Sequence, residues 1–180
     1  MAKLTIKGYP VLELNRAAFI KTAKVEAQYQ LDSDGKQVHN GTVVLVVPHE
    51  NKVYPYEANF EKPALAGIVY TAERADDGRL KEFTNEDGDY PRVGLLEAGD
   101  VFTTNALATG EGLDNEEAML DALANHKEVV VYAVAGKEGY WELTTTAPVD
   151  ADVVAVVSKW YTMPDGQPGA RLEVLRGGLI

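Results

Sequence analysis

The chain has 180 residues, no cysteine, and 46% hydrophobic residues. This hydrophobic content is too high for a disordered chain, and the lack of cysteine excludes disulfides, thiolate metal ligands and a cysteine nucleophile. The 28 acidic and 17 basic residues give a net charge of −11, which opposes binding to nucleic-acid phosphates. The longest apolar run, Val129 to Ala135, is far shorter than the roughly 20 residues that cross a bilayer. We therefore expect no nucleic-acid partner and no membrane contact, and synthesis in the cytoplasm.

The N-terminal segment differs in charge from the rest of the chain. Up to Lys24 a single acid, Glu13, faces a set of cations: Lys3, Lys7, Arg16, Lys21 and Lys24. Two interpretations stay open for residues 1–22: the first strands of the domain, or an extended arm that docks onto a partner or a neighbouring subunit. The arm hypothesis gives a set of candidate partner-binding residues: Lys3, Lys7, Arg16, Phe19 and Lys21. Residues 23–180 are then the β domain.

A β-hairpin is predicted over residues 24–47. Residues 24–31 alternate between polar and apolar side chains with the period of a half-buried strand, and residues 37–47 are rich in valine. Between them, Asp34-Gly35 supplies the turn chemistry of a tight hairpin.

Further short strands follow, separated by turns rich in Gly and Asp. We predict them at residues 52–56, 66–71, 80–83, 92–96 and 100–104. Two more hairpins are predicted near the C-terminus: 128–135 with 139–145, and 151–161 with 170–176.

One short helix is predicted over about residues 114–125. Asp114 is the expected N-cap, with Glu117 three positions later in a variant of the capping box. The fold class is thus mainly β, an antiparallel sandwich or barrel with one short helix. Two small β subdomains flanking that helix remain an alternative.

No catalytic constellation is found in the sequence. Ser33 and Ser158 lie in no nucleophile motif, and the three histidines have no metal-binding spacing. We therefore expect a protein that is not an enzyme and has no cofactor. The acidic turn at residues 85–89 is weighed as a calcium site, although an ordinary acidic turn is favoured.

The aromatic residues are candidates for packing or for an interface. They cluster at Tyr54-Pro55-Tyr56, Phe60, Tyr90, Tyr140-Trp141 and Trp160-Tyr161. Such side chains are enriched where proteins meet, and they also form the platforms on which sugars bind.

Two stretches of the chain carry a resemblance to a known family. Gly67-Ile68-Val69-Tyr70 and the run from Tyr90 to Asn105, with its Ala-Gly-Asp turn followed by Val-Phe-Thr, resemble small virion proteins of tailed bacteriophages. In that family a compact β domain decorates the capsid.

The resemblance implies a structural protein of the virion. Its function would be to bind and stabilise a bacteriophage capsid, on the capsid surface, with the major capsid protein as partner and a homotrimer as a possible oligomer. Two alternatives stay open: a tail-tube or head-fibre base protein, and a carbohydrate- or calcium-binding β module.

Overall fold

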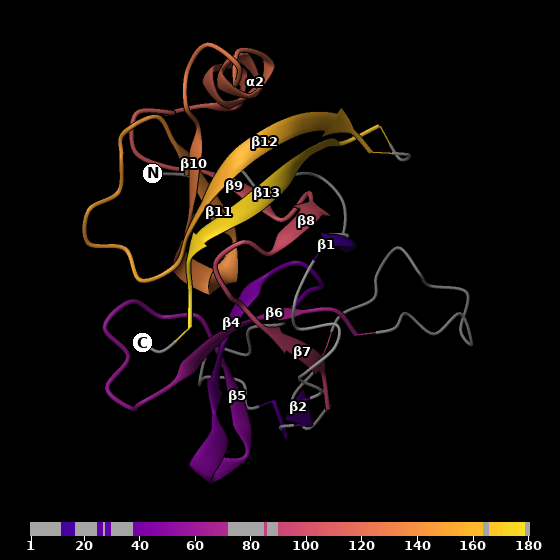
Figure 1. Cartoon of the computed structure of the whole chain (residues 1–180), viewed down its shortest axis with the longest axis vertical. Helices are drawn as coiled ribbons and strands as arrows, with labels where there is room; N and C mark the ends of the chain where they lie inside the picture. The colour runs from indigo at the N-terminus through magenta and orange to yellow at the C-terminus, as the bar shows by residue number, and fades with distance from the viewer. Residues whose placement is uncertain are drawn as a thin grey trace.

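The computed structural model describes residues 12–16, 25–26, 28–29, 38–71, 85, 90–163 and 166–178. Within these ranges the chain forms two β-sheets and one α-helix, α2 (Glu116–Ala124). In Figure 1 the two sheets lie one above the other, with the helix at the outer end of the larger one. The prediction of a mainly β fold with one short helix is confirmed.

The larger sheet contains the C-terminal half of the chain together with one N-terminal strand. Its seven described strands follow the order β1 (Leu12–Arg16), β8 (Val101–Thr104), β13 (Pro168–Arg176), β12 (Val154–Thr162), β10 (Tyr132–Ala135), β11 (Trp141–Thr144) and β9 (Leu107–Thr109). All neighbours pair antiparallel except β9 and β11, which are parallel. The hairpins β10–β11 and β12–β13 confirm the two predicted for this part of the chain.

The smaller sheet is built from residues 25–95. Its six described strands follow the order β2 (Val25–Glu26), β7 (Arg92–Leu95), β6 (Leu65–Val69), β4 (Val43–Val47), β5 (Lys52–Pro55) and β3 (Gln28–Tyr29). The strands at its two edges, β2 and β3, are separated in the chain by Ala27 alone. Two Cα atoms two residues apart in an extended chain lie only about 7 Å from each other, so the sheet has to curl until its edges meet.

The predicted hairpin over residues 24–47 is wrong. Strand β4 pairs with β5 on one edge and with β6 on the other, so neither edge is open to residues 24–31. These residues pair elsewhere, β2 with β7 and β3 with β5. The turn chemistry of Asp34-Gly35 is local, whereas the pairing of β4 is decided by long-range packing. Residues 31–37, which contain this predicted turn, lie outside the described residues.

Strand β4 packs on both of its faces. All five of its residues are buried. Val43, Leu45 and Val47 contribute to a large core, while Val44 and Val46 contribute to a second, smaller core with Val53, Val69 and Val93. Because neighbouring side chains of a strand point to opposite faces, the large core lies between the sheets and the small one lies on the other face, inside the curl.

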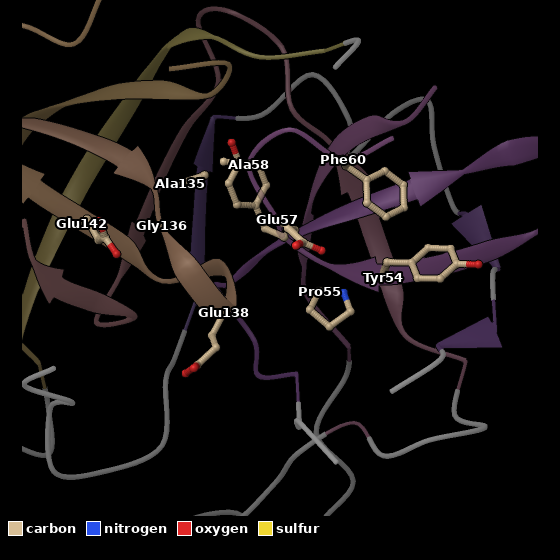
Figure 2. Close-up of a pocket in the computed structure, with 10 residues that line it drawn as sticks. Tyr54, Pro55, Glu57, Ala58, Phe60, Ala135, Gly136, Glu138 and Glu142 are labelled. Carbon is tan, nitrogen blue, oxygen red and sulfur yellow. The ribbon is translucent and has the colours of Figure 1, made fainter. Parts of the chain in front are cut away.

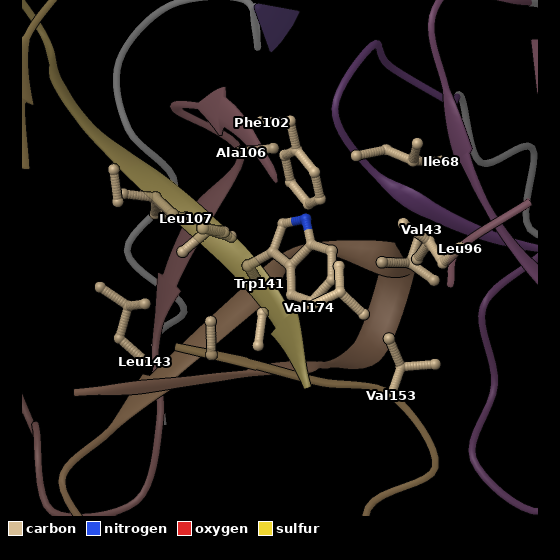
Figure 3. Packing of buried hydrophobic residues seen from close by; sticks show 14 of the residues in the cluster. Val43, Ile68, Leu96, Phe102, Ala106, Leu107, Trp141, Leu143, Val153 and Val174 are labelled. Atoms are coloured by element: carbon tan, nitrogen blue, oxygen red, sulfur yellow. The ribbon is translucent and has the colours of Figure 1, made fainter. Parts of the chain in front are cut away.

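The two sheets share the large core. It joins Val43 and Ile68 of the smaller sheet to Phe102, Trp141 and Val174 of the larger one (Figure 3). The rings of Phe102 and Trp141 are 5.5 Å apart between centroids and tilted by 44°. The sheets are thus one packed unit over the described residues.

Helix α2 closes one end of this core. Met119 and Leu123 are its buried residues. The N-cap is Asn115, whose side chain accepts a hydrogen bond from the Ala118 amide at 2.9 Å, rather than Asp114 as predicted. The helix therefore begins one residue later than the capping-box pattern indicated, and Glu116 and Glu117 lie in its first turn, where they favour the helix dipole.

The predicted partner-binding segment is described only in part. Arg16 is the last residue of β1, an edge strand of the larger sheet that pairs with β8. Lys3, Lys7, Phe19 and Lys21 lie outside the described residues. The predicted strand at 80–83 also lies outside them, and the division at residue 22 stays a prediction.

Candidate functional site

A pocket of about 510 Å³ opens where the two sheets meet. One wall comes from β5 and the loop that follows it, residues 54–60, and the other from the turn between β10 and β11. Figure 2 shows Tyr54 and Phe60 on the first side and Glu138 and Glu142 on the second, with Glu57 between them. A volume of this size suits an organic ligand or a protruding side chain of a partner.

The turn on the second wall is held in place by a close backbone contact. It forms the short 3₁₀ helix η4 (Lys137–Gly139), in which Gly139 has a φ of +77°. A Cβ atom at this position would collide with the carbonyl oxygen of Val43 in β4. Only glycine satisfies both demands, so Gly139 fixes the turn against the smaller sheet.

Glu138, next to Gly139, adopts an unusual backbone conformation. Its φ of 67° and ψ of 14° lie in the left-handed region, which non-glycine residues seldom occupy. Such a conformation costs of order 1 kcal/mol, which the surrounding structure must compensate. The turn thereby presents a carboxylate at the pocket wall.

The space for a second carboxylate depends on another glycine. A Cβ atom on Gly136 would collide with the side chain of Glu142, which lies across it. Gly136 therefore allows the Glu142 side chain to lie close against the turn, at the same wall as Glu138.

The aromatic wall is a pair of rings linked to a charged network. Tyr54 and Phe60 have ring centroids 5.4 Å apart with an interplanar angle of 48°. The Tyr54 hydroxyl donates to Glu50 at 2.6 Å, and Lys62 donates to the same carboxylate at 2.8 Å. Lys62 Nζ also lies 5.1 Å from the centre of the Tyr54 ring. The hydrogen bond from Lys62 and then that from Tyr54 hold the pKa of Glu50 below its ordinary value.

Tyr56 brings a hydroxyl to the pocket. The residue is only 5% exposed, and it makes no hydrogen bond with any residue that the structure describes. Burial, and then the negative charge of Asp152, raise the pKa of its phenol to about 12. Tyr56 is therefore a neutral group that can donate and accept hydrogen bonds at neutral pH.

No family model, curated protein or solved structure matches this chain.

The acidic turn weighed as a calcium site is described at one residue. Asn85 is buried, donates to the Val38 carbonyl at 3.1 Å and accepts from the Thr71 hydroxyl at 2.9 Å. Residues 86–89 lie outside the described ranges. In the described part of the chain, no three Asp, Glu or His side chains come together as metal ligands. Within the same part, none of the helical structure has the length and apolar character needed to cross a membrane.

The sequence indicated part of this pocket. Tyr54, Tyr56 and Phe60 were expected as packing or interface residues, whereas Glu57, Glu138 and Glu142 were not singled out. The Tyr-Pro-Tyr run followed directly by Glu57 is the sequence pattern that could have indicated an aromatic and acidic surface. Glu138 and Glu142 could not be linked to it, since their proximity depends on how the two sheets pack.

Proposed function

We propose that this chain is a non-catalytic structural protein of a tailed-phage virion that binds and stabilises the capsid. The proposal begins from the resemblance of residues 67–70 and 90–105 to phage virion proteins. These two stretches are separate in the sequence but adjacent in the fold, where Gly67, Ile68 and Val69 pair with Leu95, Gly94 and Val93. This adjacency is the observation that carries the proposal, because the resemblance then covers one structural unit.

The same unit connects the two sheets. β7 belongs to the smaller sheet and β8 to the larger one, and the turn at residues 97–100 joins them. The buried Asp100 accepts from the Glu97 amide at 2.9 Å, and Gly99, with a φ of +93°, donates to the Val174 carbonyl at 2.8 Å. The Ala-Gly-Asp turn thus joins the two sheets through specific hydrogen bonds. This role supports the proposal that the turn is a feature shared with the phage virion proteins.

Capsid binding is tested with heads assembled from the major capsid protein of the same genome. Sedimentation of the chain with these heads supports the proposal, and electron microscopy locates the bound protein. Density over the capsid surface agrees with a decoration protein, while density on the tail or at isolated vertices favours the tail-tube or head-fibre base alternative. Absence of the chain from both heads and assembled particles would overturn the proposal.

The N-terminal segment needs a test that leaves β1 intact. Deleting residues 1–22 would remove an edge strand of the larger sheet along with the cations. We therefore choose the pair Lys3→Glu and Lys7→Glu, with the pair Lys127→Glu and Arg176→Glu as control, because both control residues are exposed and the net charge changes equally. Loss of head binding by the first pair alone supports the arm. An equal loss in both pairs, or in neither, contradicts it.

A further inference from the structure

The pocket between the sheets has a marked charge asymmetry. Glu57, Glu138 and Glu142 contribute carboxylates, and its described lining residues contain no lysine or arginine. Carboxylates along the walls of a partly enclosed site make its potential negative, which favours a cationic ligand over a neutral one.

The arrangement of the carboxylates favours an organic cation over a bare metal ion. Among the described residues, no three acidic side chains come within reach of a common metal ion. The carboxylates are instead spread along the pocket: Glu138 and Glu142 lie on the wall away from the rings of Tyr54 and Phe60, and Glu57 lies between (Figure 2). An ammonium or guanidinium group on an apolar stem fits such a site, since the stem can lie along the rings while the charge reaches a carboxylate.

The chain already binds one of its own cations in this way beside the pocket. Lys62 lies over the Tyr54 ring, 5.1 Å from its centre, and donates to Glu50 at 2.8 Å. The aromatic and acidic combination that we assign to the pocket is therefore one that this fold uses on an adjacent surface.

Tyr56 supplies an independent observation. Its hydroxyl makes no hydrogen bond within the described structure, although the residue as a whole is only 5% exposed. Because Tyr56 lines the pocket, a ligand there can provide the missing partner. An ammonium or guanidinium N–H group donates to a phenol oxygen.

We propose that this pocket binds the side chain of a lysine or arginine presented by a partner protein. The aromatic pair packs on the aliphatic stem, Glu57 and Glu138 neutralise the charge, and the Tyr56 hydroxyl accepts a hydrogen bond. This inference does not require the partner to be a capsid subunit. It assigns the pocket a chemical class of ligand whichever protein carries it.

The test uses a blocked peptide with two lysines separated by glycines, the same peptide with both lysines acetylated, and maltotriose. We expect calorimetric binding of the lysine peptide alone, weakened by added salt. Glu57→Gln and Glu138→Gln should each lower the affinity about fivefold or more, and Tyr56→Phe about threefold, with folding checked by circular dichroism.

Glu116→Gln is the matched control, because it removes the same charge from an exposed residue of α2 outside the pocket. The affinity of this variant for the lysine peptide should stay within about twofold of that of the unchanged protein. No binding of the lysine peptide, equal binding of the acetylated peptide, or an equal effect of Glu116→Gln would overturn the inference. Stronger binding of maltotriose would overturn it in favour of a carbohydrate module. The head-binding experiment can fail or succeed independently of these results.

Discussion

The indole Nε1 of Trp141 donates a hydrogen bond to the Gly41 carbonyl at 3.1 Å, from the larger sheet to the segment that leads into β4 of the smaller one. Both residues are buried, and Trp141 has no solvent exposure. Trp141 belongs to the large core, so this bond ties that core to the smaller sheet and helps to fix the relative position of the two sheets.

Trp141→Phe should therefore destabilise the protein by about 2–4 kcal/mol, through the lost hydrogen bond and the space left by the smaller ring. Trp160→Phe is the control. The Trp160 Nε1 is buried without a hydrogen-bond partner in the described structure, so removing it costs little. Urea unfolding followed by circular dichroism measures both changes, and equal losses would contradict the assigned hydrogen bond.

Gly139→Ala should cost at least about 3 kcal/mol, since the new methyl group meets the Val43 backbone as well as an unfavourable φ. Gly166→Ala measures the destabilisation that comes from the unfavourable φ alone. Gly166 has a φ of +84° and open space around its Cβ position, so we expect only about 1 kcal/mol there. Thermal unfolding of the two variants compares the effects. A Gly139→Ala protein as stable as Gly166→Ala would mean that the turn is not held against β4.

Stability should fall as the pH rises from 10 to 12, because the folded protein keeps the Tyr56 proton to a pKa of about 12 whereas the ordinary value is 10.0. The stabilising effect is complete below pH 10 and is lost as the pH passes through the folded-state pKa. One pKa unit corresponds to about 1.4 kcal/mol, and partial hydration through the pocket leaves an expected loss of about 1–2 kcal/mol. Urea unfolding at several pH values measures it. Tyr56→Phe should remove this part of the pH dependence, and an unchanged slope in that variant would contradict the assignment.

Lys62→Met should raise the pKa of Glu50 towards its ordinary value of 4.5, because the hydrogen bond from Lys62 is the largest cause of its lowering. Carboxyl-carbon NMR titration measures the shift. The folded-state pKa is depressed, so the contribution of Glu50 to stability is present above pH 4.5 and is lost as the pH falls through its folded-state value. Lys127→Met, at an exposed position, should leave the titration unchanged. If both variants behave alike, the contact between Lys62 and Glu50 is not maintained in solution.

The sequence predicts those parts of the fold that depend on neighbouring residues. The hairpins β10–β11 and β12–β13 are recognisable because each joins two strands through one short connection. The hairpin over residues 24–47 had equally good turn chemistry, yet β5 and β6 occupy both edges of β4. Local turn chemistry carries no information about such competition between distant strands.

The pocket, like the pairing of β4, depends on contacts between residues that are distant in the sequence. Tyr54, Tyr56 and Phe60 were identifiable from their aromatic character, because they lie within one short stretch. Glu138 and Glu142 reach them through the packing of the η4 turn against β4, which depends on the fit of Gly139. A close approach of two backbones leaves no pattern in the sequence beyond the glycine itself.

The five residues from Val25 to Tyr29 protect two strand edges at once. Their first part covers the edge of β7 and their last part covers the edge of β5. The hairpin of β4 and β5 closes locally, from Val47 to Lys52, whereas β3 reaches from Gln28 to Lys52 and β2 from Val25 to Val93, so we expect the hairpin to form before this segment is added. Until then, two rows of unpaired amide and carbonyl groups are open to other chains. Self-association during folding should therefore depend on how quickly this short segment finds its place.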